Sequence, residues 1–542
     1  MERNTETILL TDGYKLDHRR QYPKGTEYVY CNFIPRSCNW YPEAQEGVVV
    51  FGIQYFVKEY LIKQFTKHFF GLPKPEAVGA FSRRVSTFLG SDAFEVIGSK
   101  HIEDLYDLGY LPVSIKALPE GTLCPFGVPV LTITNTLPEF FWLPNYLETL
   151  LSTTLWLPMT SATTARIAKK ALIEHAKKTG FPEGFDLGFN CHDFSMRGMA
   201  GVEAAVMSGM GHMTSWNGSE TLPAIAALEE YYGADAEKEL IAATVPATEH
   251  SVMCAGGKDT EFDTFKRLLT EVYPNGFVSI VSDTWDFWQV ITDYIPRLKE
   301  TIMSRNGRFV VRPDSGDPVD IICGPDPRDI IELNGNKYYV WGYMSKGDAQ
   351  FQEITYKQLK RDPEFAEKHL ISEAQIKGAY ECLWDIFGGT TTEKGYKMLD
   401  THIGLIYGDS ITLEKQKQIY ERLEAKGFAA TNIVLGFGSY TYQLKSRDSL
   451  GFAMKATWCQ INGEPHEIFK SPKTDSGVKK SLKGLCQVTL VDGKYKVKDQ
   501  CTPEEEVDSC LQPVFMDGVE FNPTTLKEIR SNVDKSIQAS LC

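Results

Sequence analysis

The stretch Phe277-Val-Ser-Ile-Val-Ser-Asp283 is a short apolar run, rich in β-branched residues, that ends abruptly in a hydroxyl and a carboxylate. The same pattern occurs three more times, at Arg308-Phe-Val-Val-Arg312, at Ile403-Gly-Leu-Ile-Tyr407 before Gly408-Asp-Ser410, and at Asn432-Ile-Val-Leu435 before Gly436-Phe-Gly-Ser439. Short continuous apolar runs are typical of strands buried on both faces of a parallel sheet. The pattern therefore predicts parallel strands that carry functional residue types at their carboxyl ends.

Stretches with helical signals separate several of these strands. Thr412 can cap one helix, residues 161–178 predict another that ends before Gly180, and residues 285–303 predict a third with a bend at Pro296. Alternating strands and helices predict an α/β protein with a central β/α-barrel-like domain. In such a barrel the active site lies at the carboxyl ends of the strands.

The two ends of the chain differ from its centre. Strand-like alternation fills much of the N-terminal part and returns near the C-terminus, where Asp492-Gly493 is a hairpin signal. We predict a β-rich flanking domain, made of residues 1–160 and 443–542, that clasps a β/α-barrel-like catalytic domain over residues 161–442. Residues 320–400 are longer than an ordinary connection and are interpreted as a partly helical insertion.

The composition excludes several classes of protein. The 542 residues include 57 Lys and Arg against 71 Asp and Glu, a net charge of −14, which argues against nucleic-acid binding over a broad surface. Twelve cysteines without a Cys-X-X-Cys pair argue against a zinc ribbon and favour reduced thiols. No apolar run of 18 residues occurs and the N-terminus has no signal-peptide pattern, so we expect a cytoplasmic protein that does not span a membrane.

Two loops have residue types that suit phosphate. Arg312-Pro-Asp-Ser-Gly316 offers a guanidinium fork for phosphate and a carboxylate for a sugar diol or a Mg²⁺-bound water, although a structural Arg–Asp pair is the alternative. Gly436-Phe-Gly-Ser-Tyr-Thr441 could bring backbone N–H groups to a phosphate, or could be a plain tight turn. Residues 443–483 hold eight Lys and Arg against four acids, which also fits a solvated lysine-rich loop.

Acids and histidines add further candidates. Asp283, Asp286 and Asp409 lie at predicted strand ends, where each could instead cap a helix. Glu249 and His250 place a carboxylate beside an imidazole, although a lone histidine is more often a hydrogen-bonded structural residue. Acids beside basic residues suit a substrate that carries both phosphate and Mg²⁺.

Seven segments, in one order along the chain, resemble the nicotinamide phosphoribosyltransferases, which are type II phosphoribosyltransferases. These segments are Leu10-Thr-Asp-Gly-Tyr-Lys15, Cys191-His-Asp-Phe-Ser-Met-Arg-Gly198, Val245-Pro-Ala-Thr-Glu-His-Ser251, Val281-Ser-Asp-Thr-Trp-Asp286, Arg312-Pro-Asp-Ser-Gly-Asp-Pro318, Tyr407-Gly-Asp409 and Arg447-Asp448. The resemblance covers nearly the whole chain, to residue 518. It implies a pentosyltransferase of NAD salvage that makes nicotinamide mononucleotide and pyrophosphate from nicotinamide and phosphoribosyl pyrophosphate, with Mg²⁺ and with ATP as a stimulating co-substrate.

The resemblance also implies a homodimer with two active sites at the subunit interface. Phe194 would stack on one face of the pyridine ring, and Tyr14 of the neighbouring subunit would stack on the other. Arg312 and Asp314 would hold the nucleotide product and its ribose. The remaining implied substrate-binding residues are Gly408 and Asp409 at the ribose, Arg197 with the loop residues Gly438, Ser439 and Thr441 at phosphate, Arg36, Arg447 and Lys455 at phosphates from the neighbouring subunit, and Lys470 and Lys479 near the tunnel and phosphate entrance.

His250 matches the histidine that the family phosphorylates with ATP. A phosphorylated imidazole adds negative charge beside a site that binds Mg²⁺-pyrophosphate. By the same resemblance, Asp283 would orient the imidazole and Glu249 would help with Mg²⁺, which we expect to bind mainly through the substrate phosphates. Together with Asp314 these residues form the predicted catalytic group.

Two positions depart from the family pattern. The acid that selects nicotinamide is Asp in the family and Glu220 here; its carboxylate would accept a hydrogen bond from the amide and repel nicotinate. The phosphate loop reads Ser439-Tyr-Thr-Tyr442 where better-known members carry consecutive glycines. A nicotinate phosphoribosyltransferase therefore stays open as the alternative, and so does a non-catalytic protein on the same scaffold. A quinolinate-type decarboxylating enzyme would need more cations around the ring.

Overall fold

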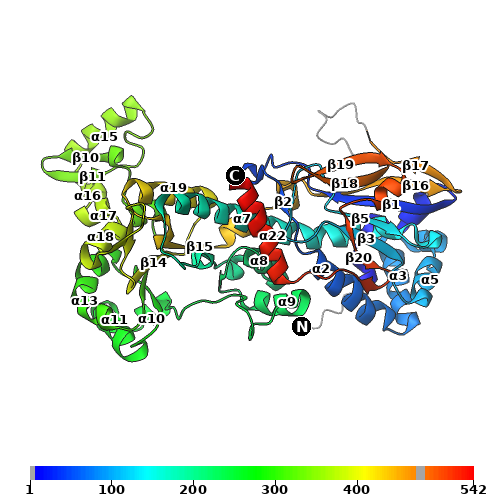
Figure 1. Ribbon diagram of the computed structural model, residues 1–542, viewed down its shortest axis with the longest axis horizontal. Coiled ribbons are helices and arrows are strands. Elements are labelled where there is room, and N and C mark those ends of the chain that lie inside the picture. The colour runs from blue at the N-terminus through cyan, green and yellow to red at the C-terminus, as the bar shows by residue number, and fades with distance from the viewer. Residues whose placement is uncertain (1–5, 471–481, 542) are drawn as a thin grey trace.

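The computed structural model describes residues 6–470 and 482–541, and these form an elongated molecule with two large sheets (Figure 1). A parallel sheet and its helices lie at one end of the long axis, and an antiparallel sheet lies at the other. Helix α7 (Glu148–Thr179) and helix α22 (Leu526–Leu541) lie between the two ends. No helix among the described residues is long and apolar enough to cross a membrane.

The parallel sheet contains the four strands that the sequence predicts and two shorter ones. Its strands are β6 (Cys191–Asp193), β7 (Gly218–Ser219), β8 (Val278–Val281), β9 (Phe309–Arg312), β14 (Ile403–Tyr407) and β15 (Ile433–Phe437), in the order β7-β6-β15-β14-β9-β8. Every pair is parallel. All residues of β8 and β14 are buried, as expected for a sheet covered on both faces.

Residues 243–247 link the two edges of this sheet. Ala243 forms a parallel bridge with Gly218 of β7, and Ala247 forms one with Ser279 of β8. The backbone N–H of Ser279 donates to the carbonyl of Pro246 at 2.8 Å. The six strands thus curve into the predicted β/α-barrel-like arrangement, and all their carboxyl ends face one side.

The predicted helices are present, with two differences. Thr412 caps α19 (Leu413–Ala425) as expected. Helix α7 ends before Gly180 but begins at Glu148, earlier than predicted, so it runs through the predicted domain boundary at residue 160. The helix predicted over residues 285–303 consists of α12 (Phe287–Gln289), the π-helical turn η11 (Val290–Tyr294) and α13 (Ile295–Ser304); Pro296 lies in the first turn of α13, where its missing N–H disrupts little.

The antiparallel sheet combines strands from both ends of the chain. Its order is β17-β16-β1-β5-β3-β20-β21, with N-terminal strands β1 (Thr26–Ile34), β3 (Val113–Ala117) and β5 (Leu131–Asn135) and C-terminal strands β16 (Ala453–Ile461), β17 (Glu464–Glu467), β20 (Gln512–Met516) and β21 (Val519–Glu520). Asp492 and Gly493, both with positive φ, turn the hairpin of β18 (Leu485–Val491) and β19 (Lys494–Cys501).

This flanking region also contains helices that the sequence pattern did not predict. They include the π-helical η4 (Phe56–Gln64), α3 (Lys74–Phe88), α4 (Ser91–Ile97) and α5 (Lys100–Leu108). One apolar core joins these helices to the sheet, because Phe56, Phe81 and Leu105 are buried in the same cluster as Ile115 and Phe515.

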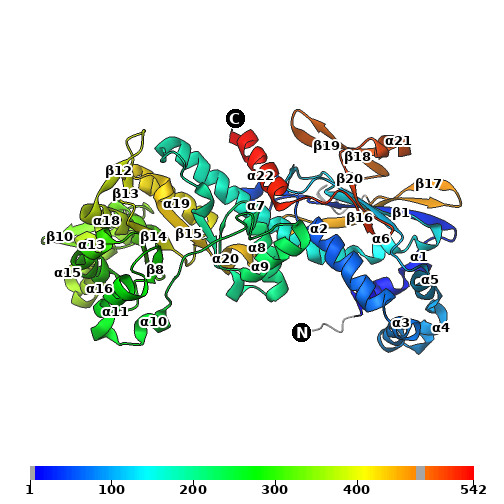
Figure 2. The same cartoon turned by 60° about the horizontal axis from the view of Figure 1, so that its bottom comes forward.

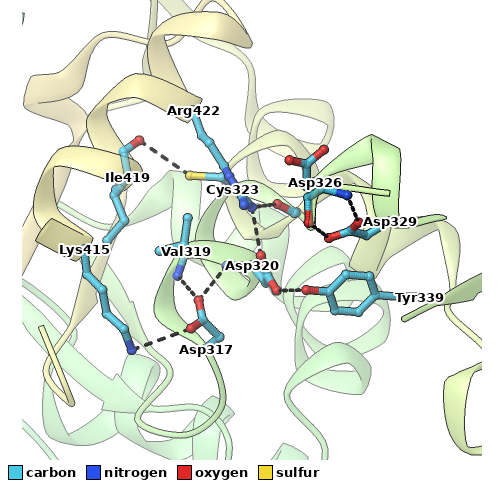
Figure 3. Close-up of polar contacts among 12 residues, drawn as sticks. Asp317, Val319, Asp320, Cys323, Asp326, Asp329, Tyr339, Lys415, Ile419 and Arg422 are labelled. Atoms are coloured by element: carbon cyan, nitrogen blue, oxygen red, sulfur yellow. Dashed lines mark hydrogen bonds and ion pairs between the residues drawn. The ribbon is translucent and has the colours of Figure 1, made fainter. Parts of the chain in front are cut away.

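Residues between α14 (Pro318–Cys323) and β14 form two hairpins, four α-helices and a short 3₁₀ helix. The hairpins and α-helices are β10 (Ile330–Leu333), β11 (Asn336–Tyr339), α15 (Ala349–Arg361), α16 (Pro363–His369), α17 (Glu373–Lys377), α18 (Ala379–Phe387), β12 (Gly389–Thr391) and β13 (Lys397–Leu399). Asp320 of α14 accepts hydrogen bonds from Tyr339 of the hairpin and from Arg422 of α19, at 2.5 and 2.8 Å (Figure 3). The insertion is thereby held against the barrel helices.

Candidate active site

Three predicted residues meet at the carboxyl ends of β8 and β9. Asp283 follows β8, and its Oδ1 lies 3.1 Å from Nε2 of His250. The Oδ2 atom of the same carboxylate accepts a hydrogen bond from the backbone N–H of Asp314 at 2.9 Å. The Asp283 side chain is 4% exposed and the His250 side chain 48%, so a buried carboxylate orients an accessible imidazole.

Arg312 is tied to the segment that carries His250. Its Nη2 donates to the carbonyl of Thr248 at 2.7 Å, and Thr248 in turn accepts from the N–H of Val281 through Oγ1 at 2.9 Å. The Nε of Arg312 is buried without a hydrogen-bond partner among the described residues. Sequence reasoning missed Thr248, although it lies inside a family-like segment two residues before His250.

The turn after β9 is braced from the neighbouring strand. Tyr407, buried at the end of β14, donates through its hydroxyl to the carbonyls of Ser315 and Gly316 at 2.8 and 3.0 Å. Asp317 then caps α14 and lies 3.6 Å from Nζ of Lys415 (Figure 3). Asp314 is therefore held in a fixed loop beside Gly408 and Asp409.

Burial raises the pKa of Asp314 above its ordinary value. Arg312 and His250 oppose this shift, whereas Asp283 and Asp409 add to it by repulsion. Three carboxylates thus share a region with one guanidinium and one imidazole. Such a group suits a cationic centre or a phosphate-bound metal ion better than a free anion.

We expect Asp314→Asn to stabilise the protein while it lowers activity. A raised pKa means that the folded state binds this proton more tightly than the unfolded state, so ionising the carboxylate costs stability as the pH rises from the ordinary pKa of Asp through the raised pKa. The stabilisation should be present at pH 7, absent below the ordinary pKa of Asp, and less than about 1 kcal/mol because solvent screens a partly exposed group. Thermal unfolding of both proteins at pH 7 and at acid pH measures it; a destabilised variant at pH 7 would contradict the expectation.

Phe194 lies on the inner side of the sheet at the end of β6. Its N–H donates to the carbonyl of Phe437 at 2.9 Å. Asp193, fully buried, accepts from the N–H of Ser195 at 2.9 Å and from Oγ1 of Thr221 at 2.7 Å, which fixes the turn that presents the ring. The ring packs directly on two backbone glycines: a Cβ added at Gly408 would come within 2.9 Å of it, and a Cβ at Gly436 would overlap it.

We expect Gly436→Ala to displace Phe194 and to lower activity strongly. The added methyl has no free space, because it also meets Cα of Gly408 at 2.8 Å. Overpacking of this kind costs about 1–3 kcal/mol. Unfolding by urea measures the loss of stability, and the KM for the aromatic base measures the displacement of Phe194. Gly79→Ala in α3 is a matched control outside the site, because a Cβ at Gly79 meets nothing within 4 Å.

The predicted phosphate loop follows β15. Gly438 precedes α20 (Ser439–Tyr442), and Ser439 lies directly against Gly198, next to Arg197. The hydroxyl of Thr441 is buried and donates to the carbonyl of Ile411, and its N–H donates to the carbonyl of Gly438 at 3.1 Å. Both donors of Thr441 are therefore engaged by backbone carbonyls, one in its own loop and one in the segment after β14.

Glu220 and the remaining acids have distinct surroundings. Glu220 follows β7 and is exposed, and its Oε1 accepts from Oγ1 of Thr244. Glu249 is exposed and accepts from the hydroxyl of Ser251, and Asp409 is exposed and accepts from that of Ser410 at 2.7 Å. The Asp286 side chain accepts hydrogen bonds from the backbone N–H groups of Trp288 and Gln289 and so caps α12. The alternative interpretation of Asp286 as a helix cap is therefore confirmed.

A second set of predicted residues lies on the flanking region. Tyr14 is 62% exposed and packs edge-on against His18, with ring centroids 4.9 Å apart. Lys15 is buried and donates to the carbonyl of Asn145 and to Glu148 at 2.8 and 2.7 Å. Helix α1 (His18–Gln21), just after Tyr14, lies at the opposite end of the long axis from β14 (Figure 2). Tyr14 and Phe194 are therefore far apart within one chain.

The predicted phosphate-binding cations of this region form a cluster. Burial lowers the pKa of Lys455, and Arg36, Lys470 and Arg447 lower it further by repulsion, whereas Glu148 opposes them. The Glu148 carboxylate contacts Lys15 through Oε2 and lies 4.0 Å from Nζ of Lys455 through Oε1. No sequence signal pointed to Glu148, which links the Tyr14 loop to the cation cluster. Lys479 lies outside the described residues.

No group of three or more His, Cys, Asp or Glu side chains in the described ranges is arranged to hold a metal ion. The cysteines at positions 31 to 510 are all free.

Comparison with known proteins identifies two families along the chain. The nicotinate phosphoribosyltransferase (NAPRTase) family matches residues 189–503, and the nicotinamide phosphoribosyltransferase N-terminal domain matches residues 6–115. The nicotinamide phosphoribosyltransferase of Acinetobacter baylyi is 45% identical over 97% of both chains. That of Mycoplasma pneumoniae is 32% identical over 88% of this chain and 94% of its own.

A solved structure has the same overall fold. The nicotinate-nucleotide pyrophosphorylase from Pyrococcus furiosus matches with a TM-score of 0.52, covering 100% of this chain and 98% of that one. The two sequences are 15% identical, so this likeness concerns the fold alone.

Proposed function

Because the chain belongs to the nicotinate phosphoribosyltransferase family, in its nicotinamide phosphoribosyltransferase branch, we propose that it transfers the phosphoribosyl group of phosphoribosyl pyrophosphate to nicotinamide. The products are nicotinamide mononucleotide and pyrophosphate, a step of NAD salvage. The observation that carries this function is the convergence of His250, Asp283, Arg312 and Asp314 at neighbouring strand ends. That group argues against the non-catalytic alternative, which the fold by itself does not.

The geometry suits a displacement at C1 of the ribose. The pyridine base stacks on Phe194, whose ring packs against Gly408 and Gly436. Loss of pyrophosphate gives the ribose oxocarbenium character, which the carboxylates of Asp314 and Asp409 stabilise. The pyridine nitrogen attacks without losing a proton, so the site needs to position the base rather than deprotonate it.

Arg312 and Mg²⁺ are proposed to neutralise the negative charge of the substrate phosphates. Arg312 donates to Thr248 through one nitrogen and keeps its Nε without a partner among the described residues. The carboxylates of Asp283, Asp314 and Asp409 suit the water ligands of a Mg²⁺ ion that enters with the substrate. When bound, Mg²⁺ neutralises the leaving pyrophosphate.

ATP is proposed to act through His250. The imidazole presents Nε2 to Asp283 and is half exposed, which leaves Nδ1 accessible to the γ-phosphate of ATP. A phosphate there would place negative charge beside the carboxylates and attract Mg²⁺-pyrophosphate. Glu249, adjacent and exposed, is proposed to assist with the metal ion.

A homodimer with shared sites is proposed because one chain does not complete the sandwich around the base. Tyr14 lies on the flanking region, at the other end of the long axis from the strand ends that surround Phe194. The cation cluster of Arg36, Arg447, Lys455 and Lys470 lies on the flanking region too. A second copy would bring these groups to the site. The free cysteines support a reducing location, for which we propose the cytoplasm.

A product assay tests the function. The enzyme is supplied with phosphoribosyl pyrophosphate, Mg²⁺ and either nicotinamide or nicotinate, with and without ATP, and each mononucleotide is quantified. We expect a higher kcat/KM for nicotinamide, because Glu220 would repel a second carboxylate. A higher kcat/KM for nicotinate would overturn the proposal.

A further inference from the structure

Glu220 depends on one neighbour for the direction of its carboxylate. The hydroxyl of Thr244 donates to Oε1 of Glu220 at 2.5 Å, across the gap between β7 and the segment at residues 243–247. Oε2 of Glu220 has no hydrogen bond to any of the described residues, and the residue is exposed. One carboxylate oxygen is thus held and the other is free for a ligand.

Both partners are attached to rigid backbone. The N–H of Ala243, just before Thr244, donates to the carbonyl of Asn217 at 2.8 Å. The N–H of Glu220 donates to the carbonyl of Asp193 at 2.9 Å. Threonine is β-branched and therefore has few χ1 rotamers, so its hydroxyl direction is well defined.

The pair lies beside the ring that would receive the base. Asp193 of β6 pairs with Ser219 of β7, so Glu220 leaves its strand next to the residue that leaves β6, which is Phe194. The Asp193 carboxylate holds Thr221 as well as the turn at Ser195, which secures the residues on both sides of this junction.

We propose that Thr244 is a positioning residue for base selection: it holds Oε1 of Glu220 so that Oε2 accepts an N–H of the carboxamide of nicotinamide and repels the carboxylate of nicotinate. This inference rests on the proposed function. A glutamate side chain has more rotamers than an aspartate, and a flexible carboxylate would lose more conformational entropy on binding. The Thr244 hydrogen bond removes part of that cost before the base arrives.

Thr244→Val tests the inference, with Thr244→Ser as the conservative variant. Removing one hydrogen bond to a charged group should lower kcat/KM for nicotinamide about tenfold, mainly through KM, while nicotinate changes less. The ratio of the two kcat/KM values should therefore fall about tenfold. Thr244→Ser, which keeps the hydroxyl, should retain most of the wild-type ratio. Thr292→Val is a matched control, because that exposed threonine donates only to Trp288 within its own helix.

A double-mutant cycle separates positioning from a structural effect. In a Glu220→Gln background, Thr244→Val should change the ratio little, because the group that it orients has lost its charge. Thr244→Ala serves if the valine variant does not fold, as judged by thermal unfolding. A ratio within twofold of wild type in the folded valine or alanine variant overturns the inference, and so does an equal loss in the Glu220→Gln background. A wild-type enzyme that prefers nicotinate overturns the proposed function instead.

Discussion

Asp283→Asn is expected to lower kcat/KM for nicotinamide about 100-fold or more. One carboxylate holds two parts of the site: Oδ1 faces His250 and Oδ2 accepts from the N–H of Asp314. An amide has a single acceptor oxygen, so it cannot accept from both partners through two oxygens as the carboxylate does, and it supplies no negative charge to the imidazole. Losing a preorganised charged group in an active site typically costs this much.

Measuring the stimulation by ATP separates the effect of Asp283 on His250 from its effect on the Asp314 loop. Synthesis is measured at saturating phosphoribosyl pyrophosphate with and without ATP, together with the ATP hydrolysed for each mononucleotide made. We expect the variant to lose the stimulation as well as most of the basal rate, because an imidazole without its carboxylate is poorly oriented for phosphoryl transfer.

Asp286→Asn provides a matched control for this prediction. Asp286 lies three residues further along and caps α12 through backbone N–H groups, and asparagine is also a good cap. Its kcat/KM should stay close to wild type. An Asp283→Asn enzyme that kept more than a third of the wild-type rate together with its ATP stimulation would refute the role of Asp283.

Mixing Tyr14→Ala subunits with Arg312→Ala subunits is expected to restore activity that neither variant has alone. Each homodimer lacks one component of both its sites. In a mixed dimer, one site combines the intact Arg312 of one subunit with the intact Tyr14 of the other, and the second site carries both defects. If subunits assort at random, half of the dimers are mixed and the recovered activity is about a quarter of wild type.

Co-expression with two affinity tags gives the mixed dimers directly. The control pair is Arg312→Ala with Asp283→Asn, since both residues lie on the same strand ends and no site in the mixed dimer is intact. This pair should show no recovery. Recovery in the control pair, or none in the Tyr14 pair, would contradict a site shared between two copies.

The strands of the parallel sheet follow closely from the sequence, because burial on both faces requires continuous apolar residues. β8, β9, β14 and β15 are predicted within one or two residues. Strands β6 and β7 have only three and two residues, which are too few for a periodic signal. They are recognised as strands only because β6 pairs with β15 and β7 pairs with β6. The helices over residues 53–108 were missed because strand-like alternation in the neighbouring segments was extended over them, although α5 buries Ile102 and Leu105 at helical spacing.

The residues of the candidate site were foreseen unevenly. Side chains that follow the strands directly, such as Asp283 and Arg312, were named from their position and from the family resemblance. Thr244, Thr248 and Glu148 were not, because each acts through a partner distant in the chain: Glu220, Arg312 and Lys455 lie 24, 64 and 307 positions away. Pairings of this kind depend on topology rather than on residue type.

By itself the sequence determined the fold class, the strand ends that carry chemistry, and the family. These depend on local apolar patterning and on contiguous motifs, which a linear chain records fully. Only the tertiary structure decided which oxygen of Asp283 serves which partner, that the hydroxyl of Thr441 donates to the carbonyl of Ile411 in the segment after β14, and that Tyr14 lies far from Phe194 in one chain. The reason is physical: hydrogen bonds have defined directions and short reach, and the folded backbone alone sets which donors and acceptors meet.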